Sequence, residues 1–204
     1  MSSAKDIEAF SLDALRAGDR AEFSRLVEAT SAKTYRLAVK MLNDPQDAED
    51  VLQETYLKAY RHLKDFDGRS SLSTWLYRIA TNEALMQLRK RRPDIISIDE
   101  PVETTEGEKE PVQIIDWCCL PEDVLLSGET RARLDGAISH LPHNLRIVFL
   151  LRDIEDLSTH ETAEVLNISE VAVKTRLSRA RLRLREELSG YYSERLGGKI
   201  YESR

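Results

Sequence analysis

Apolar residues recur at helical spacing along most of the chain, and the alternation typical of β-strands is almost absent. A first amphipathic helix is predicted over residues 23–41, with a break near residues 30–33. A second helix has Asp44 as its capping residue and Pro45 at its first position, and it extends to about Leu63. The first part of the chain is therefore expected to be helical.

A third helix and a linker come next. Ser73 or Thr74 is expected to cap this helix, and Pro93 to end it, because the residue before a proline avoids the helical conformation. The pattern then fails over residues 94–122, where prolines are separated by Glu and Thr. Such a composition predicts a flexible, self-repelling linker.

Helical periodicity returns after the linker. It predicts a helix over residues 123–140, a second helix opened by Pro142, and two more within residues 157–188. In this last segment Ser158 and Glu161 match a capping box, which marks the start of a short helix.

A tight corner separates the two helices of residues 157–188. Asn167 suits the left-handed conformation that ends a helix, and Ser169 suits the cap of the next one. The pattern is that of a helix-turn-helix. We therefore predict an all-α protein of two small helical domains, joined and kept apart by a flexible acidic linker, with the helix-turn-helix in the second domain. The expected divisions are residues 1–93, the linker at 94–122, residues 123–188, and a tail at 189–204 that is expected to be disordered.

Charge is distributed unevenly along the chain. The formal net charge of −6 argues against a protein that coats nucleic acid unaided. Residues 69–92 hold six basic side chains and one acidic side chain, a balance of +5, and residues 169–185 have the same balance. Residues 94–123 hold ten acidic side chains and one basic side chain, a balance of −9. Two basic segments thus flank an acidic connector.

The longer helix of the helix-turn-helix separates apolar from basic residues. Its apolar stripe, expected to be buried, consists of Val173, Leu177, Ala180, Leu184 and Leu188. One flank of the stripe carries Lys174, Arg181 and Arg185, and the other flank carries Arg176, Arg179 and Arg183. Thr175 and Ser178 lie near the outer crest, opposite the stripe. Cations on both flanks suit the two phosphate backbones of a major groove, and short polar groups suit base edges. This layout favours DNA contact over an ordinary solvated face.

The basic segment of the first domain is built differently. Phe66, Trp75 and Tyr77 lie among arginines, and Asn82 adds an amide. Aromatic rings among cations suit unstacked, single-stranded bases. Residue type alone favours a core or half-buried position for Trp75 and Tyr77, so both interpretations stay open here.

Several classes of protein are not supported. No Gly-rich phosphate loop, zinc-protease motif or obvious carboxylate pair occurs, so no enzyme activity, cofactor or small-molecule substrate is expected. Cys118, Cys119, His140 and His143 form a poor zinc set, because the cysteines are adjacent and Pro142 intervenes, so no metal is expected. No apolar run approaches the ~18 residues that span a bilayer, and the polar start lacks a signal-peptide core, so we expect a cytoplasmic protein without membrane insertion.

Three segments occur along the chain in this order: "DPQDAEDVLQETYLKAYRHL", "FDGRSSLSTWLYRIATN" and "LPHNLRIVFLLRDIEDLSTHETAEVLNISEVAVKTRLSRARLRLREEL". On these segments the two halves together resemble the extracytoplasmic-function (ECF, group 4) sigma factors of the sigma-70 family. The resemblance covers about residues 18–92 and 122–188. It implies an alternative sigma factor that binds core RNA polymerase and directs promoter-specific transcription initiation, reading a −35-type duplex and a −10-type single strand.

The resemblance also implies roles for individual residues and partners. Binding to core polymerase would fall to one exposed helix face with Asp50, Gln53, Glu54 and Lys58. The −10-type DNA would be bound by Phe66, Arg69, Ser70, Trp75, Arg78 and Asn82. The −35-type DNA would be bound by Lys174, Thr175, Arg176, Ser178, Arg179 and Arg183. An anti-sigma factor is an expected partner by analogy with the family.

One alternative stays open, a stand-alone helix-turn-helix regulator that binds duplex DNA as a dimer. It explains residues 157–188 but gives no reason for the first domain or for the acidic linker. Such a regulator should bind its duplex tightly by itself, whereas a sigma factor should gain specific binding only with core polymerase.

Overall fold

The computed structural model describes residues 10–91 and 128–200, with side chains described in residues 10–91 and 132–189. These ranges contain helices and no strand, which confirms the all-α prediction. The expected linker and Cys118–Cys119 lie outside the described residues. The elements are α1 (Leu12–Arg16), α2 (Arg20–Leu42), α3 (Pro45–His62), a 3₁₀ turn (Leu63–Asp65), α4 (Leu72–Arg91), α6 (Gly128–His140), α7 (His143–Phe149), a π-helical segment (Leu150–Ile154), α8 (Thr159–Leu166) and α9 (Glu170–Ile200).

Local signals for helix ends are confirmed at several positions. The Asp44 carboxylate accepts hydrogen bonds from the backbone N–H groups of the first turn of α3. Ser158 and Glu161 form the reciprocal capping box that begins α8. Asn167 has φ 53° and ends α8, and the Ser169 hydroxyl accepts a hydrogen bond from the N–H of Ala172 at the start of α9.

Three expectations about helix limits are wrong. Helix α2 has no break near residues 30–33, because the Thr30 hydroxyl bonds back to Leu26 O at 2.6 Å and to the Tyr56 hydroxyl at 2.6 Å, so it is satisfied inside the helix. Helix α4 is capped by Ser71, whose hydroxyl accepts from Thr74 N at 3.0 Å, rather than by Ser73 or Thr74. The tail is not disordered over residues 189–200, where it continues α9.

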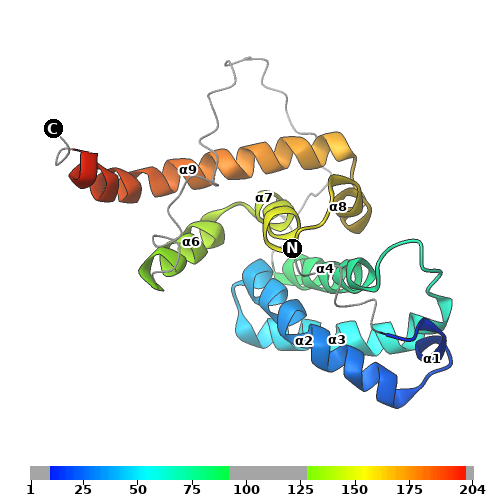
Figure 1. Ribbon diagram of the computed structural model, residues 1–204. Helices are drawn as coiled ribbons and strands as arrows, with labels where there is room; N and C mark the ends of the chain where they lie inside the picture. The colour runs from blue at the N-terminus through cyan, green and yellow to red at the C-terminus, as the bar shows by residue number, and fades with distance from the viewer. Residues whose placement is uncertain (1–9, 92–127, 201–204) are drawn as a thin grey trace.

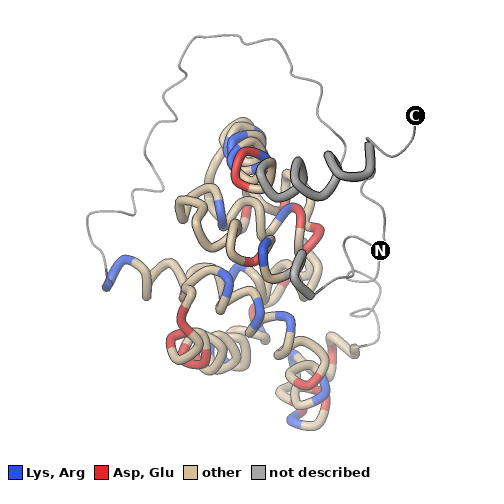
Figure 2. Tube along the Cα trace, turned by 90° about the vertical axis from the view of Figure 1, so that its left-hand side faces the viewer, with Lys and Arg blue, Asp and Glu red and all other residues tan. Residues whose placement is uncertain are grey.

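The helices are arranged in a fixed order across the molecule. Helices α1, α2 and α3 lie on one side and α9 on the opposite side, with α4, α7 and α8 between them (Figure 1). Figure 2 shows the same order from a second direction, with the basic positions of α9 at the edge of the molecule away from α2 and α3. Helix α9 is therefore the outermost element of its half.

One core belongs to the amino-terminal domain alone. It joins α1 to the first half of α2, the second half of α3 and the start of α4. Its buried residues are Leu15, Leu26, Tyr56, Ala59, Leu63, Phe66, Leu72 and Leu76. Deep burial of these side chains, with Leu26 and Ala59 at 0 % exposure, supplies the main stabilisation of this part of the domain.

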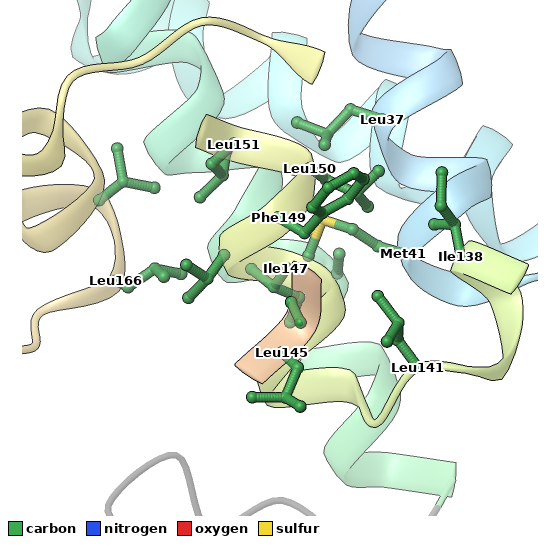
Figure 3. Packing of buried hydrophobic residues seen from close by; sticks show 14 of the residues in the cluster. Leu37, Met41, Ile138, Leu141, Leu145, Ile147, Phe149, Leu150, Leu151 and Leu166 are labelled. Carbon is green, nitrogen blue, oxygen red and sulfur yellow. The ribbon is translucent and has the colours of Figure 1, made fainter. Parts of the chain in front are cut away.

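A second core is shared by the two domains. Leu37 and Met41 of α2 lie beside Phe149 and Leu150 of the second domain, with Ile138 of α6 close by (Figure 3). Helix α8 packs on α4 across the same boundary. The expectation that the linker keeps the domains apart is therefore wrong for this structure, because each domain leaves an apolar face that the other one covers.

Polar contacts also join the two domains. Lys40 Nζ lies 2.8 Å from Asp135 Oδ1, and Thr74 Oγ1 donates to Glu161 Oε1 at 2.9 Å. The Tyr77 hydroxyl donates to Glu155 across the same boundary. Buried Arg146 reaches the Met41 carbonyl at 3.3 Å, and burial lowers the pKa of its guanidinium. The closed arrangement is thus held by hydrogen bonds as well as by apolar packing.

Candidate functional site

The four residues predicted to bind polymerase lie on one face of α3. Asp50 and Gln53 are exposed, and Glu54 and Lys58 are half-buried. Lys58 Nζ bonds Glu83 Oε1 of α4 at 2.6 Å and lies 3.8 Å from Glu54 Oε1. The ion pairs fix the position of Lys58 and tie this face to the neighbouring helix.

These residues line a groove of about 390 Å³ between α3 and α4. Leu57 of α3 and Met86 of α4 are exposed by 51 % and 45 % on its walls. Two exposed apolar side chains inside a charged rim resemble the centre of a protein–protein interface.

The α4 side of this groove was missed by the sequence reasoning. It consists of Glu83, Met86, Gln87 and Lys90. Their spacing of i, i+3, i+4 and i+7 puts them on one helix face and was available in the sequence. The contact between this face of α4 and α3 depends on tertiary packing, so it could not be predicted from the spacing alone.

The loop before α4 holds three of the residues predicted to contact −10-type DNA, Phe66, Arg69 and Ser70. Its backbone is fixed by Arg16, whose Nε and Nη2 donate to the Phe66 carbonyl at 3.0 and 2.7 Å. Gly68 has φ 77°, a left-handed turn that glycine adopts without strain. Beyond it Arg69 is exposed and pairs with Asp67, whose pKa is lowered by the Arg69 backbone N–H and side chain. Ser70 is half-buried.

The structure contradicts the prediction that Phe66 binds a DNA base. The side chain is only 5 % exposed and its ring packs on Trp75, with the ring centroids 5.2 Å apart. A ring that fills the core of the amino-terminal domain has no free face for stacking. The aromatic pattern had suggested a nucleic-acid surface, but this member of it is structural.

The remaining predicted residues of α4 keep surface open to solvent, whereas Tyr77 is buried. Trp75 is half-buried, and Arg78 and Asn82 are exposed, so these predicted residues retain accessible surface. Tyr77 is 4 % exposed and its hydroxyl donates to Glu155, in the segment before α8, which confirms the core interpretation for this residue. The first two turns of α4, which hold Trp75 and Arg78 but not Asn82, are therefore partly engaged by the second domain.

Helix α9 has the predicted stripe and one exception among the predicted contacts. All five stripe residues are buried: Val173, Leu177, Ala180, Leu184 and Leu188. Lys174, Ser178, Arg179 and Arg183 are exposed, and Thr175 is half-buried. Arg176 is 4 % exposed, so the prediction that it contacts DNA is wrong. It lies about 40° from Ala180 on the helical wheel, at the boundary of the stripe, and packs inward.

Arg181, a further cation on the flank of α9, forms an ion pair with another residue of the protein. Its Nε and Nη2 donate to the two Asp153 oxygens at 2.9 and 2.8 Å. This bidentate bond raises the pKa of Arg181 and holds the side chain against the π-helical segment that precedes α8. The exposed cations in the first three turns of α9 are thus Lys174 and Arg179, and Arg183 is exposed in the next turn.

Two family profiles match the chain. Sigma-70 region 2 matches residues 26–93, and Sigma-70 region 4 matches residues 131–184. The ECF RNA polymerase sigma factor SigW of Bacillus subtilis is 39 % identical over 174 residues, which cover 85 % of this chain and 92 % of that protein. This chain belongs to the ECF sigma factors. The RNA polymerase sigma-H factor of Pseudomonas aeruginosa is 36 % identical, over 83 % of this chain and 88 % of that protein.

Solved structures agree with the fold of this sigma factor. CnrH, solved in complex with the cytosolic domain of CnrY, has a TM-score of 0.61 and 26 % identity and covers 88 % of this chain and 95 % of its own. RpoE of Bartonella quintana, solved with the anti-sigma factor NepR, has a TM-score of 0.60 and 24 % identity, over 82 % and 97 % of the two chains. The second comparison bears on the fold alone.

Membership of the family gives the chain its general function. It is an alternative sigma factor that directs transcription initiation, and sigma factors are initiation factors rather than enzymes. Among the described residues, no group of His, Cys, Asp and Glu is arranged to hold a metal ion. Within the same ranges no helix is long and apolar enough to span a membrane.

Proposed function

We propose that this sigma factor docks on core RNA polymerase through the groove between α3 and α4. The proposal is supported by the convergence of the four predicted residues there with Leu57 and Met86, whose apolar side chains a partner surface would cover. Asp50 and Gln53 are exposed at the rim of this groove, where they are available for hydrogen bonds with the partner.

The leading end of α9 is proposed to enter the major groove of the −35-type element. The single observation that carries the DNA-reading assignment is the layout of this helix, with its apolar stripe buried and Lys174, Ser178 and Arg179 exposed. Lys174 and Arg179 would contact the phosphates on the two sides of the groove, and Ser178 would face base edges.

The −10-type element is proposed to bind along α4 as an opened single strand. Trp75, Arg78 and Asn82 offer a ring, a cation and an amide. Phe66 contributes indirectly, because its buried ring supports the ring of Trp75. Arg69 and Ser70 would bind from the loop before the helix.

The two elements cannot both be read in the closed arrangement. Elements centred near −10 and −35 are about 25 base pairs apart, which is about 85 Å of B-DNA. In the structure α4 and α8 are in direct contact through Thr74 and Glu161. At ~3.3–3.6 Å per residue, the chain between Arg91 and Gly128 can extend to about 120 Å, which is long enough to let the domains separate. We therefore infer that the shared core opens when the promoter complex forms.

A solved relative also suggests a protein partner. Because CnrH was solved with the cytosolic domain of CnrY, we infer that an anti-sigma factor binds this sigma factor as well. The finer assignment to group 4 of the sigma-70 family, and a cytoplasmic location together with RNA polymerase, are part of the same proposal.

The test is transcription with purified core polymerase. Run-off assays on a genomic library, followed by sequencing of the transcript starts, should give a set of promoters that share two elements. Without core polymerase, we expect the protein to bind the same fragments weakly and with strong dependence on salt. Tight sequence-specific binding by the protein alone would instead support the stand-alone regulator.

A further inference from the structure

The outer crest of α9 is uncharged over its first three turns. At 100° per residue, Val171, Thr175, Ser178 and Leu182 lie within about 60° of one another, between the cations of the two flanks. A crest of this kind provides no guanidinium or ammonium group for the acceptors of guanine. On the crest itself, the groups available to base edges are hydroxyl and apolar groups.

Val171 is the unusual member of the crest. It is 71 % exposed, more than any other large apolar side chain in the part of the chain whose side chains are described. It is the second residue of α9, and in a recognition helix the residues of this first turn contact base edges. Valine has no advantage over polar residues in helix formation, so local structure gives no reason for it here.

The hydroxyl of Thr175 is committed to the backbone beside Val171. Thr175 Oγ1 donates to the Val171 carbonyl at 2.9 Å, so its hydrogen is used and only its lone pairs remain for a base. The two side chains are adjacent on the crest, one turn apart. Val171 and Thr175 together thus present methyl groups and one hydroxyl that can still act as a hydrogen-bond acceptor.

In the major groove, the 5-methyl group of thymine is the apolar feature that distinguishes one base from the others. We propose that Val171 packs against the 5-methyl group of a thymine in the upstream element and helps to specify that base. This inference rests on the proposed function, since it needs α9 in the major groove. It adds a specificity-determining residue and the base that it reads.

The experiment replaces single thymines by deoxyuridine, which lacks only the methyl group. Promoter fragments identified by transcript sequencing are changed one thymine at a time across the upstream element. Their affinity for the holoenzyme, with the wild-type chain or with Val171→Ala, is measured by fluorescence anisotropy at fixed salt. Leu182→Ala is the matched control, because Leu182 is also exposed on the crest, at 49 %, but about 16 Å further along the helix.

One deoxyuridine substitution should weaken binding of the wild-type holoenzyme about fourfold, the factor expected for one buried methyl group. With Val171→Ala the same substitution should have no effect, and with Leu182→Ala the fourfold loss should remain. Equal losses for wild type and Val171→Ala, or no sensitive thymine at all, would overturn the inference. If the wild-type holoenzyme shows no specific binding to any such fragment, the proposed function itself fails, which is a distinguishable result.

Discussion

Helices α4 and α9 were both expected to contact DNA, but their predicted contact surfaces differ in how far the rest of the protein covers them. Helix α9 buries one apolar stripe and leaves Lys174 and Arg179 exposed at its leading half. The first two turns of α4 pack on the helix-turn-helix domain through Thr74 and Tyr77. In the closed form, therefore, the surface proposed to read duplex DNA is open and the surface proposed to bind the single strand is partly covered. The order of events that this suggests is upstream contact or polymerase docking first, and strand capture after opening.

The largest effect is expected on stability, from substitution of Phe66, whose ring is buried in the core of the amino-terminal domain. Phe66→Ala should lower the free energy of unfolding by about 3–5 kcal/mol, because it leaves a cavity beside Trp75 in the core of the amino-terminal domain. Denaturant unfolding measures this change. Arg69→Ala, in the same loop but exposed, should change stability by about 0.5 kcal/mol or less. A Phe66→Ala variant of normal stability that failed only in strand opening would restore the base-stacking role.

The second prediction distinguishes exposed Arg179 of α9, expected to affect DNA affinity, from buried Arg176, expected to affect stability. Arg179→Glu should weaken binding of the holoenzyme to upstream duplex about 30-fold and reduce the salt dependence, since it would remove the proposed phosphate contact and add repulsion. Its fold should be retained because the residue is exposed. Arg176→Ala should instead lower thermal stability and leave the salt dependence unchanged, because Arg176 is buried.

Arg36→Glu makes the same charge change at an exposed position of α2 and is the control. Equal losses of affinity from Arg36→Glu and Arg179→Glu would mean that net charge, rather than the face of α9, governs binding.

A smaller loss is expected at the groove between α3 and α4. Gln53→Ala combined with Glu54→Ala should weaken association with core polymerase about tenfold, since both residues line the groove and few interface residues carry most of the binding energy. Affinity can be measured with labelled protein and purified core enzyme. Glu28→Ala, which removes an exposed carboxylate from α2, should have no effect. Normal association of the double variant would refute the docking face.

The smallest effect concerns the contact that covers α4. Tyr77→Phe removes the hydrogen bond to Glu155 and keeps the ring in the shared core. The loss of about 1 kcal/mol should raise the population of the open form about fivefold. Faster amide exchange in α8 would report it. Tyr60→Phe, at an exposed tyrosine of α3, should leave the exchange rates unchanged, and identical rates in both variants would contradict the account of the boundary.

The features that follow from neighbouring residues were predictable from the sequence. The caps at Asp44 and Ser158, the left-handed Asn167 and the stripe of α9 each depend on residues within a few turns of one helix. The α3 residues of the proposed polymerase-binding face were also predictable as one surface, because they lie on a single helix.

The incorrect predictions have a common cause in tertiary packing. Phe66 is buried because α1 and the far end of α3 enclose it, and Arg176 because its position at the edge of the stripe falls inside the domain. The contact between α4 and α8 joins residues 87 positions apart, so no local pattern reports it. Composition favoured separation of the domains, since the linker between them is acidic and rich in proline, but the apolar faces of α2 and α7 determine the closed form.

We infer that the shared core of the two domains opens during initiation. Arg36 of α2 and Glu186 of α9 are exposed on the two sides of the molecule, and each can be changed to cysteine for dye labelling, with Cys118→Ser and Cys119→Ser to avoid other labels. Single-molecule energy transfer between the dyes should show one short distance in the free protein and a distance longer by several tens of Å in the complex with polymerase and promoter. A short distance that persists in complexes that make transcripts would contradict the account.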